Sequence, residues 1–136
     1  MLSERELIGK ALEARERAYA PYSGFEVGAA LLAVDGRIFT GCNVENASYG
    51  LTMCAERVAL FKAISEGARE FTAIAVACGT SPCSPCGACR QVLFEFAPDL
   101  LVIMADAEGK RIKRARLREL FPEGFGPQAL KGCGGP

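Results

Sequence analysis

The chain has 136 residues, of which 50% are apolar and 24% are charged, a composition that predicts one domain with one hydrophobic core. Its 16 basic and 16 acidic residues cancel, so the net charge is zero. The chain therefore lacks the general attraction to phosphate that nucleic-acid and anionic-membrane binders use. Little charge repulsion opposes self-association, so the composition is compatible with an oligomer.

Charges occur throughout residues 1–20, which is not the pattern of a secretory signal or a membrane span. We therefore expect a cytoplasmic protein whose thiols stay reduced. The chain has seven cysteines, and in a reducing compartment they favour metal binding or catalysis over disulfides.

The first half of the chain predicts a helix, two strands of a hairpin and a second helix, at residues 3–20, 25–34, 37–43 and 54–66. Ser3 and Glu6 form a capping box that begins the first helix. Asp35-Gly36 is a two-residue hairpin turn between the strands. Gly67 ends the second helix.

The second half predicts buried strands at residues 72–78 and 100–105 and an edge strand at residues 110–113. It also predicts helices at residues 86–96 and 115–120. Pro98 ends the longer helix, and Glu108-Gly109 makes the turn before the edge strand. This order of elements predicts an α/β fold of three α-β-α layers around a mixed five-stranded sheet. We expect one domain over residues 1–130 and a flexible tail over residues 131–136.

Three cysteines are candidate metal ligands. Cys86 and Cys89 are three residues apart on a predicted helix, so their sulfurs lie on one side and can chelate one ion. Cys54 begins the other helix, and Glu56 follows it two residues later. The chain has no histidine. Zinc with three protein ligands keeps a position for water, and a nearby carboxylate handles the proton of that water. The spacing predicts a catalytic zinc site.

Charge balance at this site calls for nearby positive groups, because three thiolates exceed the charge of one zinc ion. Two helix N-termini, with free N–H groups and positive dipole ends, offset part of the excess. Arg57 is the remaining cation, and we expect it to donate a hydrogen bond to a thiolate.

Three other interpretations of the cysteines stay open. Cys83 and Cys86 have the same spacing as Cys86 and Cys89, although Pro85 hinders a common helical turn between them. The run of Cys83, Cys86 and Cys89 also resembles part of an iron–sulfur ligand set, without its fourth cysteine before a proline. A structural zinc site with a fourth cysteine is the third alternative.

Four segments resemble the short homotetrameric cytidine deaminases, and the likeness covers about residues 1–130. They are APYSGFEVGAA at 20–30, GCNVENASYG at 41–50, CAER at 54–57 and SPCGACRQ at 84–91. Zinc deaminases as a class use a cysteine-rich zinc site and a glutamate that transfers protons. The resemblance implies that Cys54, Cys86 and Cys89 hold one zinc per chain and that Glu56 is the catalytic carboxylate.

The activity that the resemblance implies is hydrolytic deamination of cytidine and 2′-deoxycytidine to the uridines, with release of ammonia, in pyrimidine salvage. Phe25 would pack on the pyrimidine, Asn43 and Glu45 would hold the 3′-hydroxyl, and the Ala55 N–H would face the carbonyl of the base. From the residues alone, an aromatic at a strand start is more often core, and the pair at 43 and 45 suits an ordinary turn.

Homotetramer formation is also implied by the resemblance. Phe125 is similar to an aromatic that a neighbouring subunit's active site receives, and Ala47 and Tyr49 lie in a segment that is also used across subunits. The chain departs from the family after about Phe125.

The expected partner is a small nucleoside, with no nucleic acid and no membrane. Six cations between positions 110 and 118 favour a solvated edge or a subunit face over an RNA contact. Two rival functions remain. A blasticidin-type deaminase of the same fold is one, although Asn43 and Glu45 argue against it. A non-enzymatic zinc or iron–sulfur module is the other.

Overall fold

The computed structural model describes residues 2–132. The strands are β1 (Gly28–Ala33), β2 (Ile38–Cys42), β3 (Phe71–Ala77), β4 (Leu101–Ala105) and β5 (Ile112–Arg116). The helices are α1 (Glu4–Arg15), α2 (Ala55–Ser65), α3 (Gly87–Phe96), α4 (Leu117–Leu120) and α5 (Pro127–Gly132), with a 3₁₀ turn, η1 (Tyr49–Leu51).

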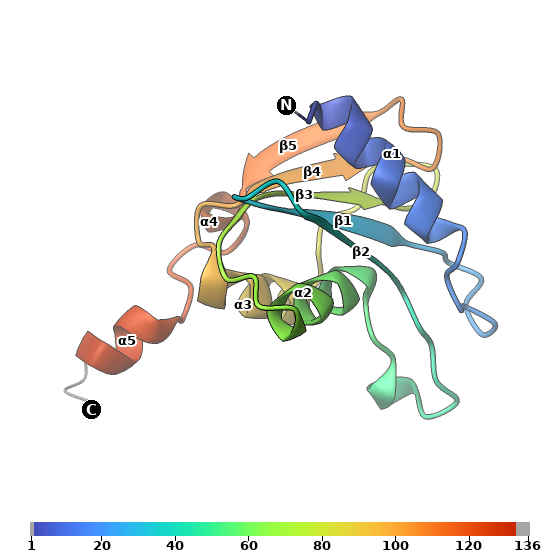
Figure 1. Ribbon diagram of the computed structural model, residues 1–136. Coiled ribbons are helices and arrows are strands. Elements are labelled where there is room, and N and C mark those ends of the chain that lie inside the picture. Colours follow the sequence, from blue (N-terminus) through green and yellow to red (C-terminus); the bar gives the residue numbers. More distant parts are fainter. Residues whose placement is uncertain (1, 133–136) are drawn as a thin grey trace.

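The strands form one sheet in the order β2-β1-β3-β4-β5. All neighbours are antiparallel except β3 and β4, which are parallel and are therefore joined by a crossover through α3. Figure 1 shows α1 on one face of the sheet and α2 and α3 on the other. The predicted fold of three layers around a mixed five-stranded sheet is confirmed.

The two faces of the sheet carry separate apolar clusters. The larger lies under α2 and α3 and includes Ile74 and Val76, whereas the smaller lies under α1 and includes Ala73 and Ala75. These four residues alternate along β3, as a strand with both faces buried requires. Small side chains on the α1 face let that helix approach the sheet closely.

Two glycines fix how near the helices lie. A Cβ atom at Gly28 would be 2.0 Å from the carbonyl oxygen of Ala11 in α1. A Cβ atom at Gly41 would be 2.5 Å from the carbonyl oxygen of Ala55. Only glycine permits these approaches. Gly41 thereby sets the first turn of α2, which carries the candidate site, directly against β2.

The first helix and first strand are shorter than predicted. α1 ends at Arg15 because the chain beyond it forms a backbone bridge: Tyr19 N donates to Asn43 O at 2.9 Å and Glu45 N donates to Tyr19 O at 2.8 Å. β1 begins at Gly28, since the N–H of Val27 donates to the Asn43 side chain at 2.9 Å.

Other differences are at short elements. The sequence predicted neither η1 nor α5, and β5 lies at 112–116 instead of 110–113. Three of the cations near β5 pair with acidic residues: Lys110 with Glu108, Arg114 with Glu4 and Arg118 with Asp99. Of the predicted tail, residues 133–136 lie outside the described part of the chain.

The expectation that all cysteines stay as thiols is wrong for one pair. Cys78, directly after β3, forms a disulfide with Cys83 in the loop that leads to α3. Cys78 is fully buried, as its place at the end of a buried strand predicted. Across residues 2–132, no helix combines the length and the hydropathy that a membrane crossing needs.

Candidate metal and catalytic site

The three candidate ligands meet where two helices begin. Cys54 is the N-cap of α2 and Cys86 is the N-cap of α3, with Cys89 in the first turn of α3. The Sγ atoms of Cys54 and Cys86 are 3.7 Å apart, those of Cys86 and Cys89 are 3.5 Å apart, and all three lie within 4.8 Å of one another. Sulfurs bound tetrahedrally at about 2.3 Å from zinc are roughly 3.8 Å apart. The three thiols therefore fit one zinc ion.

Cys83 lies beside this cluster but is bonded to Cys78. Pro85, between Cys83 and Cys86, is buried outside the helix. Its carbonyl accepts a hydrogen bond of 2.8 Å from Arg90 Nε. Cys86 has the extended backbone of an N-cap residue, so the helical spacing that brings two sulfurs together begins only at Cys86.

Glu56 is the buried carboxyl group of the site, with 5% of its surface exposed. Burial raises the pKa of Glu56 to about 7, and the negative charge of Cys54 adds to the rise. A carboxyl group with a pKa near neutrality both accepts and donates protons at pH 7. Glu56 lies in the first turn of α2, two residues after Cys54, and both residues line one cavity.

Hydrogen bonds connect the thiols with Arg57. Arg57 Nη2 donates to Cys54 Sγ at 3.3 Å, and its buried Nε has no partner among the described residues. Hydrogen bonds from Cys89 and then from Arg57 and Cys86 lower the pKa of Cys54 to about 5. The pKa of Cys89 is raised because it donates its proton to Cys54 and is buried. A bound divalent cation replaces such a proton, since coordinating thiols ionise.

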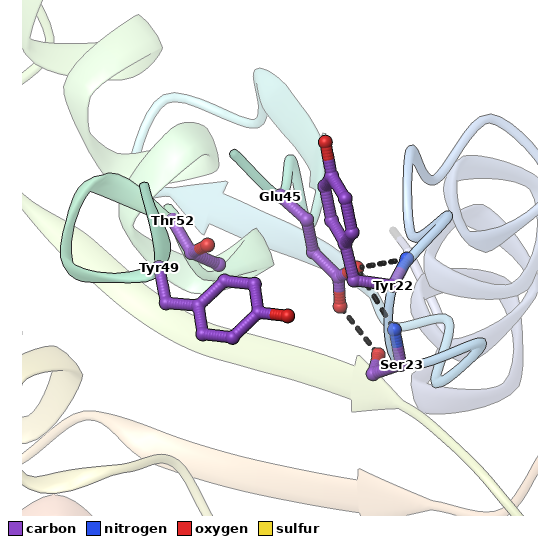
Figure 2. Close-up of a pocket in the computed structure, with 5 residues that line it drawn as sticks. All are labelled: Tyr22, Ser23, Glu45, Tyr49 and Thr52. Carbon is purple, nitrogen blue, oxygen red and sulfur yellow. Dashed lines mark hydrogen bonds between the residues drawn. The ribbon is translucent and has the colours of Figure 1, made fainter. Parts of the chain in front are cut away.

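A cavity of about 260 Å³ opens beside Glu56. Seven residues predicted to bind the metal or the substrate or to act in catalysis line this cavity: Phe25, Asn43, Glu45, Cys54, Ala55, Glu56 and Cys86. Four other predicted residues, Ala47, Tyr49, Cys89 and Phe125, are not among its lining residues. A second cavity of about 390 Å³ shares Ser23, Glu45 and Thr52 with it and is completed by Tyr22 and Tyr49. Figure 2 shows these five residues around the second cavity.

Phe25 is not a core residue, since 49% of its surface is exposed. Its ring lies against Gly79, where a Cβ atom would be 3.0 Å from the ring. Asn43 is buried, and its side chain holds the backbone around Phe25: Nδ2 donates to Phe25 O at 2.8 Å and Oδ1 accepts from Val27 N at 2.9 Å. Asn43 thus fixes the segment that carries the aromatic ring.

Glu45 accepts three hydrogen bonds from the segment before Phe25. Its Oε1 accepts from the backbone N–H groups of Tyr22 at 3.0 Å and Ser23 at 3.1 Å, and its Oε2 accepts from Ser23 Oγ. The hydrogen bond from the Ser23 hydroxyl lowers the pKa of Glu45 most, and the two backbone N–H groups lower it further. The carboxylate is therefore ionised at neutral pH.

The residues predicted to act across subunits do not line the cavity beside Glu56. Ala47 is exposed, and Tyr49 is 73% exposed beside the second cavity. Phe125 is 55% exposed on the connection between α4 and α5, where its carbonyl accepts from Gln91 Nε2 at 2.8 Å.

The sequence reasoning missed several lining residues: Tyr22, Ser23, Val27, Thr52, Met53, Cys83 and Ser84. A signal was present for four of them, because Tyr22, Ser23 and Val27 belong to the 20–30 segment and Ser84 to the 84–91 segment that carry the family resemblance. The contacts of Tyr22 and Ser23 with Glu45 span 23 and 22 positions, so no local pattern reveals them.

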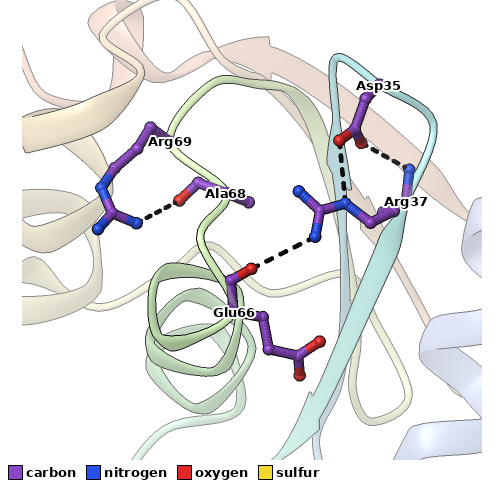
Figure 3. Close-up of polar contacts among 5 residues, drawn as sticks. All are labelled: Asp35, Arg37, Glu66, Ala68 and Arg69. Carbon is purple, nitrogen blue, oxygen red and sulfur yellow. Dashed lines mark hydrogen bonds and ion pairs between the residues drawn. The ribbon is translucent and has the colours of Figure 1, made fainter.

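A further polar cluster lies at the opposite end of α2. Asp35 accepts from the backbone N–H of Arg37 at 3.1 Å, and Arg37 Nη1 donates to Glu66 O at 3.4 Å. Arg69 Nη1 donates to Ala68 O at 2.9 Å (Figure 3). These contacts tie the β1–β2 turn, predicted from Asp35-Gly36, to the end of α2. The acceptors are the Asp35 carboxylate and backbone carbonyls at the end of α2, so these contacts stabilise the loops.

The site combines three thiols spaced for one metal ion with a buried carboxyl group and a cavity. These features, on an α/β fold, are those of a zinc-dependent hydrolytic enzyme. Residues 1–105 match the family model described as the cytidine and deoxycytidylate deaminase zinc-binding region. The chain belongs to this family.

Relatives in the family are similar over most of their length. A cytidine deaminase of Halalkalibacterium halodurans is 53% identical over 91% of this chain and 95% of its own. One of Mycobacterium tuberculosis is 46% identical over 88% and 87%. The crystal structure of cytidine deaminase from Burkholderia pseudomallei, at 52% identity, covers 91% of this chain and 100% of its own with a TM-score of 0.88.

Proposed function

We propose that the protein is a zinc-dependent cytidine deaminase, which converts cytidine and 2′-deoxycytidine to the corresponding uridines and releases ammonia. The observation that carries the proposal is the buried Glu56 beside three sulfurs with zinc spacing. The names of the relatives agree with it. The spacing of the sulfurs supports one zinc per chain, bound by Cys54, Cys86 and Cys89.

The bound zinc supplies a Lewis acid that lowers the pKa of water. Glu56 accepts the proton that the attacking water loses as it adds to C4 of the base. Glu56 then donates that proton to N3. It next accepts the proton of the hydroxyl group now on C4 and passes it to the departing amine, so that a carbonyl and ammonia form and one carboxyl group acts as base and as acid. A pKa of about 7 suits both directions. Arg57 withdraws charge from Cys54 through its hydrogen bond.

Substrate contacts come from the rest of the cavity. Ala55 is the first residue of α2, where a helix leaves its N–H groups without intrahelical partners, and this N–H faces the carbonyl of the base. The exposed ring of Phe25 packs on the pyrimidine. Asn43 and Glu45 bind the 3′-hydroxyl of the sugar.

The active form is a homotetramer in which Ala47, Tyr49 and Phe125 complete the site of a neighbouring subunit. Exposed aromatic side chains support this proposal, since Tyr22, Tyr49 and Phe125 are each at least half exposed and large apolar surfaces mark interaction sites. Residues 1–130 form the single domain of each subunit. The enzyme works in the cytoplasm, in pyrimidine salvage.

The two rival functions are less well supported. Glu45 and Asn43 suit a sugar hydroxyl, which disfavours a blasticidin-type deaminase. An iron–sulfur module would leave Glu56 without a role. The raised pKa of Glu56 beside a cavity is typical of a functional carboxyl group and therefore disfavours such a module.

The test is ammonia release from cytidine, 2′-deoxycytidine, cytosine, CMP and blasticidin S, with metal content measured on the same sample. We expect turnover of the two nucleosides, little of the others, and one zinc per chain. Faster turnover of blasticidin S would favour the first rival. A coloured iron protein without ammonia release would favour the second.

A further inference from the structure

Ser23 connects two residues that the proposed function assigns to the substrate. Its Oγ donates a hydrogen bond to Oε2 of Glu45 and accepts one of 3.0 Å from the backbone N–H of Phe25. The direction of the first bond is fixed, because an ionised carboxylate only accepts. Figure 2 shows the Ser23 hydroxyl and the Glu45 carboxylate facing each other at the edge of the cavity.

The carboxylate of Glu45 has room for one further donor. Two carboxylate oxygens offer about four lone-pair positions, and three of them are taken by the N–H groups of Tyr22 and Ser23 and by Ser23 Oγ. The remaining position matches one hydroxyl group of a sugar. Its direction depends on the plane in which the carboxylate is held.

Within residues 2–132, the Ser23 hydroxyl is the one hydrogen-bond donor to Oε2 and so fixes that plane. Both backbone N–H groups bond Oε1, so they hold one oxygen and leave the other oxygen able to swing about it, since the terminal torsion of a glutamate has a broad profile. The bond to Oε2 removes this freedom. The same hydroxyl also holds the backbone of Phe25, so the sugar end and the ring end of the cavity share one anchor.

We propose that Ser23 is a positioning residue for the sugar: it sets the plane of the Glu45 carboxylate so that the free lone pair meets the 3′-hydroxyl. This inference rests on the proposed function. Ser23 does not touch the reacting atoms, so its effect belongs to substrate binding and depends on the 3′-hydroxyl being present.

The test compares 2′-deoxycytidine with 2′,3′-dideoxycytidine, which differ only in the 3′-hydroxyl. Ser23→Ala should raise KM for 2′-deoxycytidine about tenfold, the value of one hydrogen bond to a charged group, with kcat changed less than about twofold. KM for the dideoxy substrate should rise much less, because that substrate loses only the support of the Phe25 backbone. Ser23→Thr, which keeps a hydroxyl, should restore most of the binding.

Two further variants separate positioning from loss of structure. Ser65→Ala removes a hydroxyl at the far end of α2, where it bonds only Lys62 O, and should change neither KM. In a Glu45→Gln background, Ser23→Ala should add little, because a residue that acts through Glu45 is coupled to it. This comparison holds even where Ser23→Ala lowers stability, since both members of the pair are measured against the same background.

An equal rise of KM on both substrates, or full additivity with Glu45→Gln, would overturn the role of Ser23. Failure of the proposed function has a different signature: the wild-type protein with its zinc would release no ammonia from cytidine or 2′-deoxycytidine.

Discussion

The two ends of the cavity are built in different ways. At the metal end, Cys54, Glu56 and Cys86 lie at the first turns of two helices, and Glu56 is almost fully buried. At the sugar end, Ser23 and Glu45 lie in connections between elements and are held mainly by hydrogen bonds of the loops.

This difference separates chemistry from recognition. Helix termini packed on a sheet hold reacting groups rigidly and keep water away, which proton transfer and metal binding require. Loops carry exposed aromatics such as Tyr49 and leave one side open, which a second subunit can close. Substitutions at the metal end should therefore affect turnover, and those at the sugar end should affect KM.

The largest effect is expected from loss of a metal ligand. Cys86→Ser removes the sulfur that lies between the other two, at 3.7 Å from that of Cys54 and 3.5 Å from that of Cys89. Zinc content should fall well below one per chain and activity should be lost, as measured by elemental analysis and ammonia release. A variant that keeps both would exclude Cys86 as a ligand.

Glu56→Gln should lower turnover by at least about 10⁴-fold, the upper end for general acid–base catalysis, because one carboxyl group serves several proton transfers. The amide keeps the shape of the side chain but cannot transfer a proton at neutral pH. Zinc content and substrate binding should stay close to wild type, which elemental analysis and binding measurements check. Loss of zinc in this variant would make Glu56 a ligand.

Sequence patterns predicted the metal end better than the sugar end, and the reason is distance along the chain. Cys86 and Cys89 are three apart, so helical periodicity groups these two ligands, whereas Cys54 is 32 positions from Cys86 and was added because a catalytic zinc needs a third protein ligand. Ser23 and Glu45 are 22 apart, and their contact depends on how two loops fold back.

The same reason explains where the fold differs from prediction. The hairpin at Asp35-Gly36 was predicted from a local signal and formed as expected. The predicted end of α1 was wrong, because the backbone bridge from Tyr19 to Asn43 and Glu45 joins positions far apart in the sequence and no local pattern indicates it. The disulfide of Cys78 and Cys83 was missed because the compartment argument excluded disulfides for all cysteines together.

Arg57→Gln tests how the metal end balances its charge. The wild-type guanidinium donates to Cys54, and its removal leaves the thiolate charge less compensated, which raises the pKa of water at the metal. We expect turnover to fall about 10- to 100-fold with zinc retained, since substitution beside the ligands typically costs this much. Unchanged turnover at full zinc content would show that the helix N-termini suffice. Elemental analysis and steady-state kinetics distinguish the two.

The smallest effect on activity is expected at Cys83, although it has the same spacing from Cys86 as Cys89 has. Its sulfur is bonded to Cys78, and it lies before the N-cap of α3, outside the helix that carries Cys89. Cys83→Ser should therefore keep one zinc per chain and near wild-type turnover. It should lower the free energy of unfolding by about 2 kcal/mol under oxidising conditions, because the disulfide spans five positions, and by much less with reductant present. If Cys83→Ser lost zinc as Cys86→Ser does, the ligand pair would be Cys83 and Cys86. Helix α3 would then begin after the metal site and not within it. The metal end of the cavity would depend on a loop as the sugar end does, and the difference between the two ends would be lost.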